Sequence, residues 1–367
     1  MGERINITRS SMPPYEEFID AIKPLWDSHW MTNMGRYHNE LEEKLKDYLK
    51  VDKISLLVNG HMSLEMIIQA FSFPEGSEII TSPFTFISTT HAIVRNGCKP
   101  VFCDVKASDG TIDEEKIEDL ITEKTVAILP IHVYGNLCAT EKIEKIAKDY
   151  NLKVIYDAAH AFGESLNEVG IGNFGDASIL SFHATKVFNS IEGGAVCFHD
   201  DWIYEKLYNL KNFGIRSETL VAEVGANAKM NEFCAIMGLC NLRHLAEAIK
   251  SRKEAFDYYC EALDKIKGIS TFRVLKPGEV NNYAYFPILV TDEASCNRNE
   301  IYDKLRSDDI FARKYFYPIT ADQNCFRNKY KEVDLHVARD LSKHILTLPL
   351  YEGITRAEQD RVIKALS

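Results

Sequence analysis

Short apolar segments alternate with helix-like segments through the first two hundred residues, and this alternation restricts the possible folds more than any other feature of the chain. The segments that we expect to be strands are Ile54–Val58, Glu78–Thr81, Pro100–Asp104, Thr125–Tyr134, Val154–Tyr156 and Ala195–Phe198. Helices are expected between them, among others over Leu64–Phe71, Ile112–Ile121, Thr140–Tyr150 and Trp202–Leu210. Such alternation predicts an α/β fold, in which a mostly parallel sheet is covered by helices on both faces.

A long helical stretch from Ala235 to about Ile266 is expected to carry the chain into a smaller second part. The strands expected there are Tyr283–Val290, with alternating polarity, and a run that begins at Ile310. We therefore expect a large domain over residues 1–240 and a smaller C-terminal α+β domain over residues 241–367.

Composition excludes several classes of protein. The net charge of −11 argues against a nucleic-acid-binding surface, although a phosphorylated substrate would need only a local cationic pocket. The nine cysteines are scattered without a CxxC pair or a zinc-like spacing, which indicates reduced thiols and no metal site. No apolar run approaches a membrane span, and the amino terminus lacks the apolar core of a signal peptide. We expect a cytoplasmic protein with no membrane partner.

The strongest chemical signal is Lys186, which lies between two strand-like apolar runs. Its neighbours Phe182, Val187 and Phe188 predict partial desolvation, which favours the neutral amine and Schiff-base chemistry with aldehydes. A single lysine is more often a strand-end residue whose amine reaches water. Asp157, however, ends the β-rich run from Lys153, and a carboxylate beyond a strand end can keep a pyridinium nitrogen protonated. Pyridoxal phosphate requires such a partner.

Seven motifs then connect the chain to a known family. It resembles, almost end to end, the sugar-nucleotide aminotransferases of the DegT/DnrJ/StrS type, which are fold-type I pyridoxal-phosphate enzymes. The motifs are Thr32–Gly35, Asn59–Gly60, Pro83–Thr89, Pro130–Gly135, Asp157–Ala161, Ser181–Lys186 with Glu192–Gly194, and Gly225–Glu232.

The resemblance implies roles for residues around the cofactor ring. Lys186 would form the Schiff base and move the proton of the amino donor, while Asp157 would bind the ring nitrogen. His160 would form a hydrogen bond with the phenolic oxygen, unless it is a structural histidine in a turn. Phe86 would stack on the ring, unless it is a core phenylalanine. Ser181 would bind the phosphate.

The phosphate site is expected where Asn59 and Gly60 lead into a helix, because helix N-termini bind anions through backbone N–H groups. The family usually has threonine after this glycine. Here the residue is His61, so the side-chain contact is open, with His61 and Ser63 as candidate substitutes. Asn227 matches a residue that reaches the phosphate of a neighbouring subunit, which implies a homodimer with shared active sites. Lys229 stands where many members have arginine, and we treat it as a substrate-binding candidate without assuming the same contact.

The segment Ala312–Pro318 is basic and aromatic. Arg313, Lys314 and Tyr315 are candidates to bind a nucleoside diphosphate or the carboxylate of the amino donor. The alternative is an edge strand that carries solvated cations.

The function that the resemblance implies is transfer of an amino group from L-glutamate to a nucleotide-linked keto sugar. The motif variants are most similar to members that aminate dTDP-4-keto-6-deoxyglucose at C4, which gives 4-amino-4,6-dideoxyglucose for the O-antigen of lipopolysaccharide. Amination at C3 and UDP-linked substrates are alternatives. Two other classes are a dehydratase branch with histidine at the lysine position and a non-catalytic cofactor-binding regulator. Lys186 argues against the first, and the presence of both Lys186 and Asp157 argues against the second.

Overall fold

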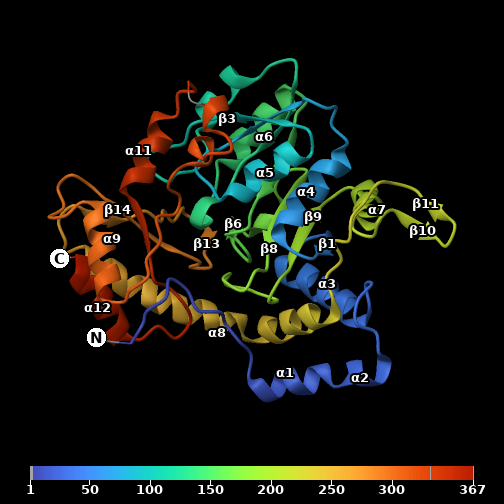
Figure 1. The fold of residues 1–367 in the computed structure, drawn as a ribbon, viewed down its shortest axis with the longest axis horizontal. Helices are drawn as coiled ribbons and strands as arrows, with labels where there is room; N and C mark the ends of the chain where they lie inside the picture. The colour runs from blue at the N-terminus through green and yellow to red at the C-terminus, as the bar shows by residue number, and fades with distance from the viewer. Residues whose placement is uncertain (1–2, 331, 367) are drawn as a thin grey trace.

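The structure is a computed structural model that describes residues 3–330 and 332–366. A seven-stranded sheet lies at its centre, with helices on both sides (Figure 1). In spatial order its strands are β1 (Lys53–Leu57), β9 (Gly194–Phe198), β8 (Ala177–Ser181), β5 (Lys153–Asp157), β4 (Thr125–Leu129), β2 (Glu78–Thr81) and β3 (Lys99–Phe102). All pairs from β8 to β3 are parallel, whereas β9 is antiparallel to both of its neighbours. The predicted α/β class and mostly parallel sheet are confirmed.

The helices are distributed over the whole chain. Their bounds are α1 (Tyr15–Ile22), α2 (Pro24–Ser28), α3 (Arg36–Leu49), α4 (Gly60–Phe71), α5 (Ile87–Arg95), α6 (Thr140–Asp149), α7 (Asp201–Leu210), α8 (Glu232–Leu263), α9 (Arg298–Ser307), α10 (Arg327–Tyr330), α11 (His336–His344) and α12 (Arg356–Leu366). No helix in the described part of the chain combines the length and the apolar character needed to cross a membrane.

Both faces of the sheet are apolar because the side chains of a strand point alternately to either side. In β8, Ile179 packs with α4, α5 and α7, whereas the next residue, Leu180, packs with α3 and α8 on the opposite face. In β4, Ile128 packs with residues of α6 in a third apolar cluster. Because both faces are covered, the strand ends are the part of the sheet where polar side chains can meet a ligand.

The C-terminal part of the chain contains a second, antiparallel sheet. Its strands are, in spatial order, β12 (Ile269–Thr271), β14 (Phe286–Val290) and β15 (Ile345–Leu348). The remaining short strands are β6 (Ser165–Leu166), β7 (Val169–Gly170), β10 (Ile215–Ser217), β11 (Leu220–Val221) and β13 (Glu279–Val280). Helices α9, α12 and the end of α8 cover the antiparallel sheet, and Ile5 from the N-terminal segment joins their core.

The division into domains 1–240 and 241–367 stays a prediction. Helix α8 runs continuously across residue 240 and packs against α1, α3 and α12, so it contacts both ends of the chain (Figure 1).

Three predicted elements were wrong. Residues 112–121 contain two short 3-10 turns, Glu114–Lys116 and Glu118–Leu120, in place of a helix. The strand expected to reach Tyr134 ends at Leu129, because the next residue, Pro130, has no N–H to continue the ladder. Tyr134 adopts a positive φ of 57° in the tight turn that follows. The run from Ile310 forms only isolated bridges, Ile5 to Ile310 and Arg313 to Thr347, and the second of these is made to the edge strand β15.

Candidate active site

A cavity of about 450 Å³ opens where β5, β8 and the N-terminus of α4 meet. It lies at the carboxyl ends of parallel strands, where ligands bind in open α/β sheets. Nine of the twelve residues predicted for the site line it: Gly60, His61, Phe86, Asp157, His160, Ser181, Lys186, Arg313 and Tyr315.

Lys186 enters the cavity from a turn that follows β8. Its backbone N–H donates to the carbonyl of His183 at 2.8 Å, and its side chain is half-buried. The amine Nζ donates to the hydroxyl of Tyr285 at 3.2 Å. The predicted partial desolvation of this lysine therefore agrees with its burial.

Asp157 is the last residue of β5, and its buried carboxylate faces the same cavity. Oδ2 accepts a hydrogen bond from Thr89 Oγ1 at 2.8 Å, and Oδ1 accepts one from the backbone N–H of Ala159 at 3.1 Å. Burial raises the pKa of this carboxyl, against the opposing effects of these two donors and of the charge on Lys186. A cationic N–H in the cavity would reverse that shift, so the site suits a protonated ring nitrogen.

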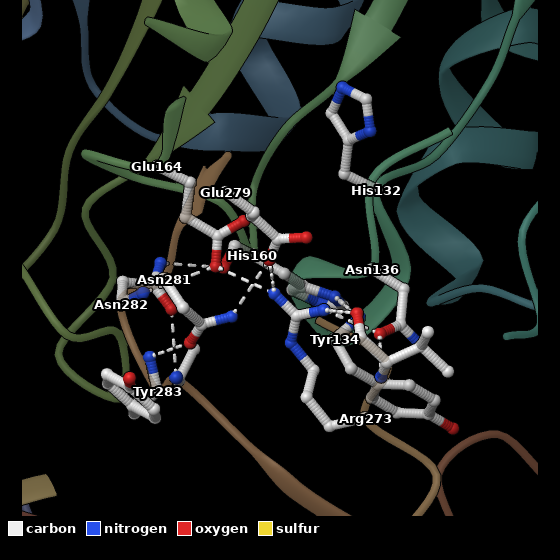
Figure 2. A network of polar contacts seen from close by, with 12 residues as sticks. His132, Tyr134, Asn136, His160, Glu164, Arg273, Glu279, Asn281, Asn282 and Tyr283 are labelled. Carbon is white, nitrogen blue, oxygen red and sulfur yellow. Dashed lines mark hydrogen bonds and ion pairs between the residues drawn. The ribbon is translucent and has the colours of Figure 1, made fainter. Parts of the chain in front are cut away.

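His160 is fixed in one tautomer by the chain itself. Its Nδ1 accepts a hydrogen bond from the backbone N–H of Tyr134 at 3.0 Å, so the ring proton lies on Nε2 (Figure 2). Burial, together with the nearby charge of Lys186, holds the pKa of His160 well below its usual range. The ring is therefore a neutral imidazole that offers one N–H donor, as the predicted contact with a phenolic oxygen requires.

The N-terminus of α4 forms a narrow cradle beneath Ser181. Asn59 caps the helix by accepting from the N–H of Met62 at 2.8 Å, which leaves the N–H groups of Gly60 and His61 for an acceptor outside the helix. A Cβ at Gly60 would lie 2.8 Å from the Cβ of Ser181. Only glycine therefore lets the Ser181 side chain and the helix terminus approach one ligand together.

The side chain of His61 is engaged elsewhere. Nδ1 lies 2.8 Å from Ser88 Oγ, and Nε2 lies 2.9 Å from the carboxylate of Glu65. Ser63, the other candidate substitute for the family's threonine, donates to the carbonyl of Asn59 at 3.0 Å and lies outside the cavity. This arrangement favours backbone N–H groups over either side chain as phosphate ligands.

The two phenylalanines near α5 differ in their surroundings. Phe84 is buried in an aromatic cluster, whereas Phe86 is 55% exposed and lines the cavity. Phe84 is therefore a core phenylalanine, whereas Phe86 is not.

A second cavity, of about 900 Å³, adjoins the first and shares Phe86, Arg313 and Tyr315 with it. Its cations are Arg306, Arg313 and Lys314, and none of them pairs with a carboxylate among the residues that the structure describes. They lie over aromatic rings instead, with Arg306 Cζ 4.0 Å from the centroid of Phe311 and Lys314 Nζ 4.4 Å from that of Tyr302. In an acidic chain, three unpaired cations around one cavity indicate an anionic ligand.

Asn227 and Lys229 are the two predicted residues that line neither cavity. Lys229 Nζ donates to Asn227 Oδ1 at 2.6 Å, and both lie near the base of the β10–β11 hairpin, which projects from the body of the molecule (Figure 1). Burial lowers the pKa of Lys229.

Sequence reasoning missed Tyr285 and gave Thr89 no role. Thr89 stands inside the motif Pro83–Thr89, so the signal was present, and the structure adds its bond to Asp157. Tyr285 precedes a buried strand in a region with no family motif, and no sequence signal distinguishes it from a core tyrosine.

An α/β sheet that brings a lysine, a buried carboxylate and a helix N-terminus to one cavity defines a pyridoxal-phosphate-dependent transferase. Comparison with known proteins gives the family. A model of the DegT/DnrJ/EryC1/StrS aminotransferase family matches residues 14–367, and the chain belongs to this family.

Individual relatives cover nearly the whole chain. A dTDP-4-amino-4,6-dideoxy-D-glucose transaminase of Shigella dysenteriae is 42% identical over 356 residues, which are 97% of this chain and 96% of the relative. A transaminase of the same name from Escherichia coli is 39% identical over 370 residues, 99% of this chain and 98% of the relative. The solved structure of DesI in the presence of its TDP-sugar product superposes with a TM-score of 0.94 at 27% identity, and the match covers 100% of this chain and 93% of that one.

The predicted family, enzyme class and cofactor are thereby confirmed: the protein is a sugar-nucleotide aminotransferase that uses pyridoxal phosphate. The residues present fit this cofactor. The N-terminus of α4 leaves the N–H groups of Gly60 and His61 for a phosphate, and the buried Asp157 carboxylate lacks an ion-pair partner among the described residues.

Proposed function

We propose that this enzyme transfers the amino group of L-glutamate to C4 of dTDP-4-keto-6-deoxyglucose and so forms dTDP-4-amino-4,6-dideoxyglucose. Two relatives at 42% and 39% identity carry the name of that activity. The observation that carries the proposal is that the cavity with Lys186, Asp157 and His160 shares lining residues with a larger cavity, whose cations pair with no carboxylate in the described part of the chain.

The chain's own residues would hold the cofactor from several sides. The Asp157 carboxylate accepts a hydrogen bond from the ring nitrogen, and His160 Nε2–H donates to the phenolic oxygen. The N–H groups of Gly60 and His61, with the Ser181 hydroxyl, bind the phosphate. Phe86 covers one face of the ring and excludes water from it.

When bound, pyridoxal phosphate supplies an aldehyde that accepts amines and a ring that withdraws electrons from the carbon beside the nitrogen. Lys186 supplies the amine that holds the cofactor. Lys186 Nζ would then serve as the group that moves the proton of the amino donor's α-carbon. Two half-reactions with one shared lysine predict ping-pong kinetics.

The second cavity is proposed to bind the substrate. Arg313 and Lys314 bind the diphosphate of the sugar nucleotide or the donor carboxylate, and Tyr315 packs against the same ligand. Charge-assisted hydrogen bonds to phosphate are among the stronger polar contacts in proteins. Among the residues that the structure describes, those that line this cavity include three cationic side chains and no carboxylate, which supports the assignment.

The active enzyme is proposed to be a homodimer in which Asn227 reaches the cofactor phosphate of the neighbouring subunit. Lys229, which is bonded to Asn227, is proposed to contact the substrate. Neither residue lines either of the two cavities of its own chain. Nearby side chains are also apolar and open to solvent, with Leu220 53%, Val221 65% and Val224 88% exposed. A second chain over this hairpin would remove that surface from water.

The enzyme is further proposed to act in the cytoplasm and to supply the amino sugar for O-antigen, a part of lipopolysaccharide. The thiol form of all nine cysteines supports a reducing compartment.

The test is an assay of purified enzyme with glutamate, pyridoxal phosphate and dTDP-4-keto-6-deoxyglucose, with the product identified by mass spectrometry and NMR. We expect an amino group at C4. Lys186→Ala is the control and should give no product. Preference for a dTDP-linked 3-keto sugar, or for a UDP-linked or GDP-linked ketone, over the dTDP-linked 4-keto sugar would contradict the proposed substrate while leaving the enzyme class intact.

A further inference from the structure

Tyr285 lines the active-site cavity, and its hydroxyl is the hydrogen-bond partner of the Lys186 amine. The distance from Lys186 Nζ to Tyr285 Oη is 3.2 Å. Within residues 3–330 and 332–366, no other group bonds to this amine and no carboxylate pairs with it. The place of the amine in the cavity therefore depends on this one contact.

The ring of Tyr285 is held by packing from three sides. Its centroid lies 4.7 Å from that of His160, at an interplanar angle of 58°. Tyr134 and Tyr315 meet it edge-on at centroid distances of 6.1 and 6.4 Å. A half-buried ring that is confined in this way keeps its hydroxyl at one point in the cavity.

The backbone before Tyr285 is tied to the segment that carries His160. The buried side chain of Asn282 donates from Nδ2 to the carbonyls of His160, at 3.0 Å, and Phe162, at 3.1 Å (Figure 2). Its Oδ1 accepts from the N–H of Ala284 at 2.9 Å. One amide thus fixes Tyr285 relative to the histidine that the cofactor would contact.

We infer that Tyr285 is a positioning residue for the reaction, and that its hydroxyl holds the Lys186 amine where it meets the cofactor aldehyde and the donor proton. Lysine has a flexible four-carbon side chain, and a single fixed acceptor removes much of its rotational freedom before the reaction. The inference rests on the proposed function of Lys186 as the amine that reacts.

The experiment measures how fast Lys186 captures added pyridoxal phosphate in cofactor-free enzyme, by trapping with borohydride and peptide mass spectrometry. Tyr285→Phe keeps the ring and removes the hydroxyl. The loss of one hydrogen bond should slow capture about tenfold. Binding of 4′-deoxypyridoxine phosphate, which has no aldehyde, should stay within about twofold, because the cavity itself is intact. In the amino-transfer assay, kcat should fall while KM for the sugar nucleotide stays the same.

Tyr283→Phe is the matched control. Tyr283 lies two residues earlier, outside the cavity, with its ring on Phe256 at a centroid distance of 5.3 Å, and its substitution should leave capture unchanged. Capture by Tyr285→Phe at the unsubstituted rate would overturn the inference, and so would a parallel loss of affinity for the aldehyde-free analogue, since that result means a structural role only. If the unsubstituted enzyme captures nothing on Lys186, the proposed function of this lysine fails as well. If the enzyme captures pyridoxal phosphate on Lys186 but does not aminate the dTDP sugar, the proposed substrate is rejected, whereas the inference about Tyr285 is unaffected.

Discussion

The two walls of the active-site cavity are built in different ways. One wall consists of strand ends and a helix N-terminus, with Asp157, Ser181 and Gly60 held by the backbone of the parallel sheet. The other wall comes from irregular segments, and its Tyr285 and Arg313 are placed by aromatic packing and by a few hydrogen bonds. The difference indicates that the sheet wall serves cofactor chemistry, which all substrates share, while the irregular wall serves recognition of one nucleotide sugar.

Asp157→Asn should have the largest effect among the tests of this difference. An amide cannot stabilise a protonated ring nitrogen as a carboxylate does, so kcat should fall by roughly 10²-fold or more, with little change in KM. Steady-state kinetics of both half-reactions would measure this.

Asp176→Asn is the matched control for that substitution. Asp176 accepts the N–H of Val154 in the same strand at 2.8 Å, but it lies outside the cavity. This variant should keep its kcat. A retained kcat in Asp157→Asn would contradict the role of the sheet wall.

Substitution of Arg313 or Lys314 by alanine should give the opposite kinetic pattern. Loss of one charge-assisted contact to a diphosphate should raise KM for the sugar nucleotide roughly tenfold or more. The half-reaction with glutamate should keep its rate if these cations bind the nucleotide. If they bind the donor carboxylate, the glutamate half-reaction slows instead.

Lys253→Ala serves as the control for these cation substitutions, because Lys253 is exposed in α8 and pairs with Asp257 away from both cavities. It should change neither parameter. An unchanged KM for both substrates in the Arg313 and Lys314 variants would contradict a binding role for the irregular wall.

Behind the irregular wall, Arg273 lies between two buried carboxylates, Glu164 and Glu279 (Figure 2). Burial, opposed by the charge of Arg273, raises the pKa of Glu164 from its usual 4.5 to about 8. The folded state thus keeps a proton that the unfolded state loses. The stabilisation from this group is complete below pH 4.5 and is lost as the pH rises toward about 8.

Glu164→Gln should therefore flatten the decline of the unfolding free energy between about pH 5 and 8, measured by denaturant titration at each pH. Glu279→Gln removes the carboxylate nearest Arg273 and should destabilise the protein at every pH in that range. Equal slopes for Glu164→Gln and the unsubstituted enzyme would show that Glu164 is ionised in the folded state.

The smallest expected effect concerns the cap of α4. Asn59→Ala should cost about 1 kcal/mol of stability and also weaken binding of the cofactor phosphate, because the freed helix terminus loses its order. Asn231 caps α8 in the same way, accepting from the N–H of Cys234 at 2.9 Å, but lies outside the cavity. Asn231→Ala should cost similar stability without changing cofactor affinity, and a weaker affinity in both variants would contradict a specific role for α4.

The two walls also differ in how far the sequence predicts them. Strand ends follow from apolar runs, so Asp157 and Lys186 could be placed beside strand ends, and Gly60 at a helix N-terminus, from the order of residues alone. Motifs of the family then identified Phe86, His160 and Ser181. All of them line the cavity, although their roles stay predictions.

The irregular wall could not be derived in this way, because its geometry depends on contacts between distant segments. The segment Ala312–Pro318 pairs with β15 through the bridge from Arg313 to Thr347, and β15 was not predicted. Tyr285 is placed by Asn282 and by packing against His160, Tyr134 and Tyr315. Periodicity within a segment contains no information about such pairings.

The most direct test of the account is the absorbance spectrum of the purified enzyme with pyridoxal phosphate, recorded before and after glutamate and again after the keto sugar nucleotide. In the unsubstituted enzyme, glutamate should abolish the visible band of the lysine-linked cofactor, and the ketone should restore it. Lys186→Ala should show neither change. The same response in Lys186→Ala, or no lysine-linked band in the unsubstituted enzyme, would contradict the claim that this cavity is the site of amino transfer.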